Sequence, residues 1–151
     1  MLGFKLNCKD MNMNTAAAID RIESALINLE TAIGEPVFDE WALVEKTSGG
    51  WKLIEYGGTR KADFLAEFNA DMAALKNTFD PSNTHPGDFA FSHEGHGTGF
   101  DAHMCVGRNI YLLLNNTRKN TGEITSNPKW TNAQIHFAEL LEAFIADPVQ
   151  A

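Results

Sequence analysis

Apolar residues recur at helical spacing in three separate stretches of the chain. In the first stretch they stand three or four positions apart, as Ile19, Ile22, Leu26, Leu29 and Ile33. This period predicts an amphipathic helix. Asn14-Thr15 offers an N-cap before the helix, and Gly34 follows it at a position where a left-handed residue is favoured.

The second stretch predicts a long helix from Arg60 to Phe79 with two distinct sides. One side is a stripe of large apolar residues, Phe64, Phe68, Met72, Leu75 and Phe79. The other side combines alanines with acids spaced four apart that lack an evident basic partner, namely Ala62, Asp63, Ala66, Glu67, Ala70, Asp71 and Ala73. Like charges at this spacing destabilise an isolated helix, whereas small side chains let a second helix approach closely. We interpret this side as a candidate interface; the alternative is a solvated face rich in alanine, the best helix former.

The third stretch predicts a helix that follows Asn127-Pro128 and stops at Asp147-Pro148. Asparagine is a favoured N-cap, and proline is favoured at the first helical position. The apolar face of this helix is formed by Trp130, Phe137, Leu140, Leu141, Phe144 and Ile145. The preceding connection, from Asn115 to Asn127, is polar and predicts one helical turn near Glu123-Ile124.

Two apolar runs separated by turn residues precede the middle helix. The run from Phe38 to Lys46 contains Trp41-Ala42-Leu43-Val44, which is apolar at odd and even positions, as in a strand covered on both faces. Thr47-Ser48-Gly49-Gly50 predicts a hairpin turn, and the run from Trp51 to Tyr56 predicts the returning strand.

The stretch from Pro86 to Thr117 predicts an antiparallel meander of short strands. Side-chain parity favours a register in which Phe91 faces Ala102 and Phe89 faces Met104. One face then holds Phe89, Phe91, Phe100, Ala102, Met104, Val106, Tyr111 and Leu113, and the other holds Ala90, Ser92, His103, Cys105, Leu112 and Leu114. Neither face is polar, so we expect helices on both sides of the sheet.

Together these patterns predict an α+β fold in a single domain over residues 1–151. We expect the element order α-β-β-α-β-β-β-α, with a five-stranded antiparallel sheet that carries helices on both faces. A chain of this length fits one domain with a substantial hydrophobic core.

The formal net charge of −8 restricts the class of partner. Nucleic acids and anionic membranes are bound through basic patches, and the sequence has no basic cluster, so we expect neither as a partner. We also expect no transmembrane span and no secretion signal, which favours a cytoplasmic location. Cys8 and Cys105 do not form a disulfide framework and are interpreted as reduced thiols, with Cys105 a small core residue.

Four of the five histidines lie in or beside the meander, at His85, His93, His96 and His103. His93 and His96, in a glycine-rich turn, could hold a metal if a third ligand came close. However, parity places His93 and His103 on opposite faces, and the spacing is not that of the helical metalloprotease motif. We therefore expect no metal, no cofactor and no catalytic residues, and we keep a metal-binding protein or enzyme that uses His93 and His96 as an alternative.

The order of elements over nearly the whole chain resembles that of the roadblock/dynein light-chain family, which has a profilin-like fold. The resemblance is carried by the helix before the first hairpin, the helix from Arg60 to Phe79, and the last helix from Pro128. It implies a strand order of 2-1-5-4-3 and a homodimer joined through the middle helix and the edge strand of the meander. It also implies a non-enzymatic interaction or regulatory role, with a small GTPase or another signalling protein as partner, or an adaptor role. The long connection from Asn115 to Asn127 departs from compact members of the family.

A PAS-like sensory module is the other alternative. Such modules share the sheet order but bind a small ligand against the sheet. They usually place several short helices where this sequence predicts one long helix, from Arg60 to Phe79. The long helix therefore favours the interaction module.

Overall fold

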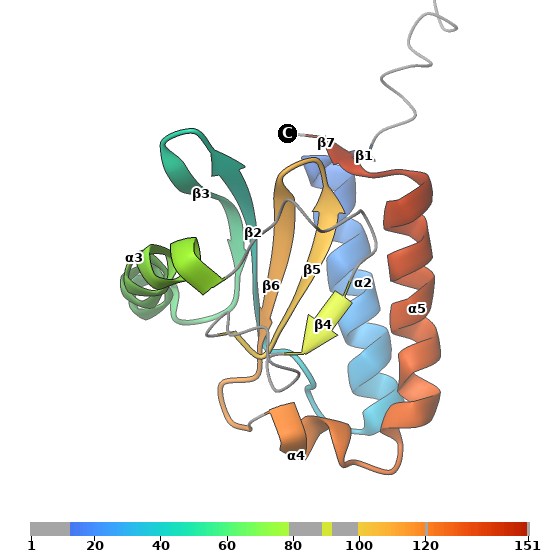
Figure 1. Cartoon of the computed structure of the whole chain (residues 1–151). Helices are drawn as coiled ribbons and strands as arrows, with labels where there is room; N and C mark the ends of the chain where they lie inside the picture. The colour runs from blue at the N-terminus through green and yellow to red at the C-terminus, as the bar shows by residue number, and fades with distance from the viewer. Residues whose placement is uncertain (1–12, 79–88, 92–99, 120, 151) are drawn as a thin grey trace, which may run out of the picture.

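The computed structural model describes residues 13–78, 89–91, 100–119 and 121–150, and Figure 1 shows how their helices and strands are layered. Within these residues, seven strands form one mixed sheet with helices on both faces. The predicted α+β class and the predicted coverage of both faces of the sheet are confirmed.

The predicted hairpin and meander form the antiparallel part of the sheet. β2 (Glu40–Thr47) and β3 (Gly50–Gly57) form the hairpin, and β4 (Phe89–Phe91), β5 (Ala102–Gly107) and β6 (Ile110–Asn115) form the meander. β6 also pairs with β2, so these strands are neighbours in the order β3-β2-β6-β5-β4. β3 therefore lies at one edge of the sheet.

Two short parallel strands enlarge this sheet. β1 (Met13–Asn14) pairs with β7 (Val149–Gln150), and Val149 also pairs with Gly107 of β5, both in parallel. The expected purely antiparallel sheet of five strands and the expected element order α-β-β-α-β-β-β-α are therefore wrong. The five predicted strands follow the implied order 2-1-5-4-3, here β3-β2-β6-β5-β4. The order of the whole sheet, β1-β7-β5-β6-β2-β3 with β4 beside β5, differs from it because β7 and β1 are added next to β5. Strands of two residues are too short to leave a period in the sequence.

The helices divide between the two faces of the sheet. α2 (Thr15–Ile33) and α5 (Trp130–Ala146) pack against each other on one face, and α3 (Lys61–Thr78) lies on the other (Figure 1). The short helix α4 (Thr121–Thr125) confirms the predicted helical turn near Glu123-Ile124.

The sheet separates two hydrophobic cores. The larger core lies under α2 and α5 and includes Ile22, Leu29, Trp41, Leu43, Met104, Leu112, Leu114, Phe137 and Phe144. The smaller core lies under α3 and consists of Ala42, Val44, Phe64, Phe68, Phe100, Cys105, Tyr111 and Leu113. Alternate residues of β2 enter different cores, which explains why its sequence is apolar at both odd and even positions.

A β-bulge in β5 overturns part of the predicted face assignment. Gly107 pairs with Ile110 and Cys105 pairs with Tyr111, so Val106 is an extra residue on β5. An extra residue reverses the parity of every later pair relative to a regular hairpin. The predicted faces were therefore wrong for four residues of β6. Tyr111 and Leu113 lie in the smaller core, and Leu112 and Leu114 lie in the larger one.

The register predicted for β4 and β5 is confirmed, with Phe89 opposite Met104 and Phe91 opposite Ala102. Phe100, which was assigned to the same face as Met104, instead lies in the smaller core. It precedes β5 in a bend, where the alternation of a strand does not apply.

The ends of α2 are those that the sequence predicts, whereas α5 begins later than expected. Asn14 Oδ1 accepts a hydrogen bond from Ala17 N at 2.8 Å, and Gly34 closes α2 with a φ of 91°. Before α5, Asn127 Oδ1 accepts a hydrogen bond from Lys129 N and so forms a turn around Pro128 instead of capping the helix.

Ile145 does not belong to the buried face of α5. The buried residues of this helix alternate three and four positions apart, as Trp130, Ala133, Phe137, Leu140 and Phe144. Ile145 lies off this stripe and is 59% exposed. Its predicted place on the apolar face is therefore wrong.

Candidate functional site

A buried carboxylate links the first hairpin to the start of α3. Glu40, the first residue of β2, is only 1% exposed. Its carboxylate accepts hydrogen bonds from the Tyr56 hydroxyl at 2.7 Å, the Arg60 guanidinium at 2.9 Å and the Asn115 side-chain amide at 3.1 Å. Removing a charge from water is costly unless it is paired and hydrogen-bonded. This network therefore joins β2, β3, β6 and the residue that precedes α3.

Arg60 extends the network from the interior to the surface of α3. Its guanidinium also donates to both carboxylate oxygens of Glu67, at 2.7 and 3.1 Å. Such paired contacts between a guanidinium and a carboxylate are geometrically specific. Hydrogen bonds from Arg60 to Glu67 and then to Glu40 raise the pKa of Arg60, and the bond from Arg60 lowers the pKa of Glu67. Burial, and then the hydrogen bond to Glu40, raise the pKa of Tyr56 to about 12.

The pairing of Arg60 with Glu67 corrects a premise of the sequence analysis. Glu67 was expected to lack a basic partner, but Arg60 stands seven positions before it and reaches along α3, beyond the three- or four-residue spacing at which side chains of one helix usually pair. The expected row of unpaired acids is therefore wrong at Glu67. Arg60 precedes the first residue of α3, so a search for ion pairs within the helix does not find it.

The described part of the predicted interface lies together on the outer side of α3. Ala62, Asp63, Ala66 and Glu67 are exposed, whereas Phe64 and Phe68 are buried against the sheet. The side chains of the other interface candidates, Ala70, Asp71 and Ala73, lie outside the described residues. We call Ala62, Asp63, Ala66 and Glu67 the outer face of α3.

The edge strand β3 lies next to α3 (Figure 1). The Tyr56 ring of β3 lies 4.8 Å from the Phe64 ring of α3. In the register with β2, Ile54 is an extra residue of β3. This bulge brings Lys52 and Glu55 onto the same face of the sheet, that of α2 and α5. In a regular strand, residues three apart point to opposite faces.

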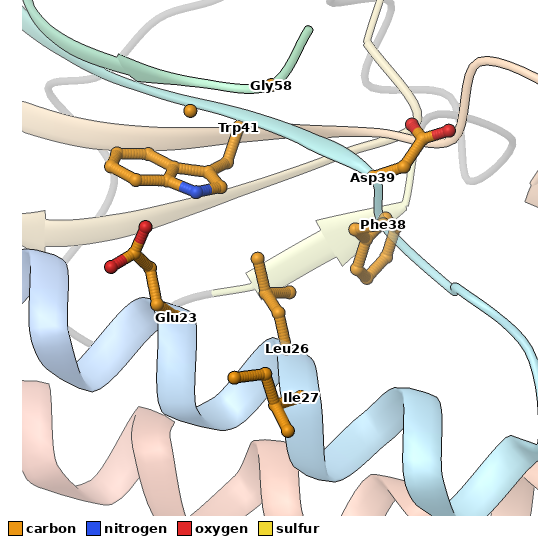
Figure 2. A pocket seen from close by; sticks show the side chains of 8 residues that line it. Glu23, Leu26, Ile27, Phe38, Asp39, Trp41 and Gly58 are labelled. Carbon is orange, nitrogen blue, oxygen red and sulfur yellow. The ribbon is translucent and has the colours of Figure 1, made fainter.

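A hollow of about 400 Å³ opens on the α2 side of the sheet (Figure 2). It is lined by Glu23, Leu26, Ile27, Phe38, Asp39, Trp41, Gly57 and Gly58. Figure 2 shows the Glu23 carboxylate rising from α2 towards the Trp41 indole, and the Asp39 carboxylate pointing away from α2. The hollow therefore combines aromatic and aliphatic walls with a carboxylate.

Most of the histidines that the sequence offers as metal ligands lie outside the described residues. His85, His93 and His96 lie outside them, and His103 is buried in β5. In the part of the chain that is described, no group of three His, Cys, Asp or Glu side chains could hold a metal ion. Cys105 is buried and donates to the Gly107 carbonyl at 3.4 Å, which confirms its prediction as a core residue.

Sequence reasoning missed both the Glu40 network and the hollow. The partners of Glu40 stand 16, 20 and 75 positions away, so no local spacing reveals them. One signal was present: Glu40 opens a run that is otherwise apolar at both parities. A carboxylate at the entry of a buried strand indicates a polar partner in the fold, because an unpaired buried charge is so unfavourable.

The fold and these features define an α+β protein with a mixed sheet between two helical layers. Neither the models of protein families nor the curated proteins nor the solved structures include a match to this chain. Of the helices within the described ranges, none has the length and hydropathy needed to cross a membrane.

Proposed function

We propose that the protein is a non-enzymatic interaction module that forms a homodimer through the outer face of α3 and the adjoining edge strand β3. The observation that carries the proposal is the placement of α3: Phe64 and Phe68 are buried against the sheet, and Ala62 and Ala66 are exposed on a helix that lies beside an edge strand. The resemblance to roadblock proteins supports the same role, and implies a small GTPase or another signalling protein as a further partner or an adaptor role.

The outer face of α3 is suited to a second copy of itself. Ala62 and Ala66 stand one helical turn apart and are exposed. In a two-fold arrangement the same patch meets itself, and alanines facing alanines allow the two helices to approach closely. Asp63 then borders the contact, whereas Glu67 is already neutralised by Arg60 of its own chain.

β3 is suited to pair with a second copy because its charges are self-complementary. In an antiparallel pair centred between Leu53 and Ile54, Lys52 lies opposite the partner's Glu55, and Glu55 lies opposite the partner's Lys52. The bulge places both charges on the same face of each strand. Opposite charges directly across from one another contribute roughly 0.2–1 kcal/mol per pair. The two-fold symmetry therefore makes the Lys52–Glu55 ion pair twice, without any basic or acidic excess.

The edge used here differs from the one that the family resemblance implies. That resemblance implies the edge strand of the meander, β4, but α3 lies next to β3 at the other edge of the sheet. A surface made of a helix and its neighbouring edge strand is continuous. We therefore place the dimer contact at α3 and β3.

Charge reversal on β3 tests the proposal. We expect Lys52→Glu and Glu55→Lys each to weaken the dimer, because like charges then meet at both symmetric positions. The loss of the two attractions alone amounts to about 0.4–2 kcal/mol. The double variant, with both changes in one chain, restores opposite charges and should recover the dimer. Sedimentation velocity over a dilution series measures each dissociation constant.

Glu142→Lys on α5 is the matched control, since it reverses an exposed carboxylate on the opposite layer. It should leave the dissociation constant unchanged. Bulges on edge strands can also serve to block pairing with another chain. If β3 has that role, the single reversals leave the state of association unchanged and the double variant shows no rescue, which contradicts the proposal.

A further inference from the structure

The hollow beside Trp41 has the construction of a small-molecule site. Its volume of about 400 Å³ falls within the range of about 300–1,000 Å³ that is usual for ligand pockets. The apolar lining comes from α2, with Leu26 and Ile27, and from the start of β2, with Trp41 in the strand and Phe38 just before it. Ile27 is 61% exposed although it is a large apolar residue, so it offers contact area at the mouth of the hollow.

The aromatic wall is held in place by a close approach of backbone. Gly57 is paired with Trp41 across β2 and β3. A Cβ on Gly57 would lie 2.3 Å from the indole ring, so glycine lets the ring pack flat against the strand. Trp41 is 5% exposed, and it is among the residues that line the hollow. The ring is therefore preorganised and does not have to be ordered by a ligand.

The charge of the hollow is negative. Its lining contains two carboxylates, Glu23 and Asp39, and no lysine, arginine or histidine. Asp39 is already used, because its two oxygens accept hydrogen bonds from Thr117 N at 2.9 Å and Thr117 Oγ1 at 2.8 Å. Glu23 forms no ion pair with any residue that the structure describes. It is exposed on α2 and faces the indole.

We propose that this hollow binds a small organic ammonium ion. The cationic group lies between the Glu23 carboxylate and the open part of the Trp41 ring, and its alkyl substituents contact Leu26, Ile27 and Phe38. An aromatic ring attracts a cation through its quadrupole, and this attraction is strongest for tryptophan. A carboxylate on the other side adds direct charge attraction, whereas an anionic ligand would be repelled by both groups.

The ammonium site and the proposed dimer rest on different side chains, although Gly57 at the end of β3 lines the hollow. Trp41, Leu26 and Phe38 belong to the core under α2 and α5, whereas α3 covers the opposite face of the sheet. The failure of one proposal therefore leaves the other standing. A ligand at this hollow adds a small-molecule signal to an interaction module.

The test compares choline with 3,3-dimethylbutan-1-ol, which has the same shape without the charge. Both are titrated into the full-length ¹⁵N-labelled protein, and the assigned indole N–H signal of Trp41 is followed by NMR. We expect choline to shift this signal saturably and to bind at least about tenfold more tightly than the alcohol. Glu23→Gln should weaken choline binding about tenfold and leave binding of the alcohol unchanged.

Glu30→Gln is the matched control, because Glu30 is exposed on the same helix but does not line the hollow. It should bind choline as the wild type does. The proposal is overturned by the absence of a saturable shift with choline, by equal affinities for choline and the alcohol, or by equal effects of Glu23→Gln and Glu30→Gln.

Discussion

At the scale of single residues, Glu40 decides how the first hairpin, β6 and the start of α3 are held together. Its buried carboxylate accepts hydrogen bonds from Tyr56, Arg60 and Asn115. A buried carboxylate contributes to stability only when each of its hydrogen-bond donors is in place. Removing the Glu40 carboxylate leaves these donors without their acceptor. Glu67, at the exposed end of the same network, is bound by Arg60 alone among the described residues.

Glu40→Ala should therefore lower the free energy of unfolding by about 2–3 kcal/mol, the value of hydrogen bonds to a charged group. Glu67→Ala is the control, and should cost no more than about 1 kcal/mol because its ion pair is largely exposed. Urea denaturation followed by circular dichroism measures both. Equal effects of the two substitutions would show that the buried end of the network has no special role.

The same network makes a prediction about pH. The pKa of Tyr56 is raised to about 12 by burial and by its hydrogen bond to Glu40, so the folded state holds the phenolic proton more strongly than the unfolded state. Its contribution to stability is complete below the ordinary pKa of about 10 and is lost as the pH rises through about 12. In an absorbance titration at alkaline pH, Tyr56→Phe should remove the component that ionises near pH 12. A component of Tyr56 near pH 10 in the folded protein would contradict the structure.

Gly57 offers a second test at this scale. A methyl group there would lie 2.3 Å from the Trp41 ring, so Gly57→Ala should force the indole out of its position and destabilise the protein by about 1–3 kcal/mol. Gly49→Ala is a matched control in the same hairpin, because its methyl group would meet only Thr47 Oγ1 at 3.9 Å. Thermal unfolding of the two variants gives the comparison. Equal melting temperatures would contradict the close packing of Trp41 on β3.

At the scale of elements, the sequence predicts the helices and strands whose apolar residues are periodic. It does not predict a change of register that one inserted residue causes. α2, α3 and α5 follow from apolar residues at helical spacing, and the β4–β5 register follows from parity. The bulge at Val106 leaves no comparable signal, and it moves Tyr111 and Leu113 to the other core. The partners of Glu40 in the polar network were not predictable from local spacing, because they stand 16, 20 and 75 positions away; only the place of Glu40 at the start of an apolar strand indicated that it has a polar partner.

The parallel pairs at the ends of the described chain depend on Gly107. A Cβ there would lie 2.3 Å from the Val149 carbonyl oxygen, so Gly107→Ala should displace β7 from β5. β1 is paired with β7 and should be released as well. We expect faster amide hydrogen exchange in both short strands, with the β2–β3 hairpin unchanged. Unchanged exchange at Val149 would show that β7 does not need this close approach.

At the scale of the whole molecule, the two faces of the sheet carry different helices and different candidate sites. α2 and α5 cover the larger core and leave the hollow beside Trp41. α3 covers the smaller core and exposes alanines beside the edge strand β3. Ala62→Glu with Ala66→Glu should weaken the proposed dimer at least about tenfold, or ~1.4 kcal/mol, because charged side chains would then meet across its two-fold contact. On a solvated face the same change is nearly neutral, since glutamate is a good helix former.

The mass of the wild-type protein in solution tests the central claim most directly. Sedimentation equilibrium should give twice the 16.7 kDa mass of the single chain, and the Ala62→Glu/Ala66→Glu variant should shift towards that single-chain mass while keeping the wild-type circular dichroism spectrum. A wild-type mass of 16.7 kDa at every concentration measured would contradict the homodimer and the role assigned to α3 and β3.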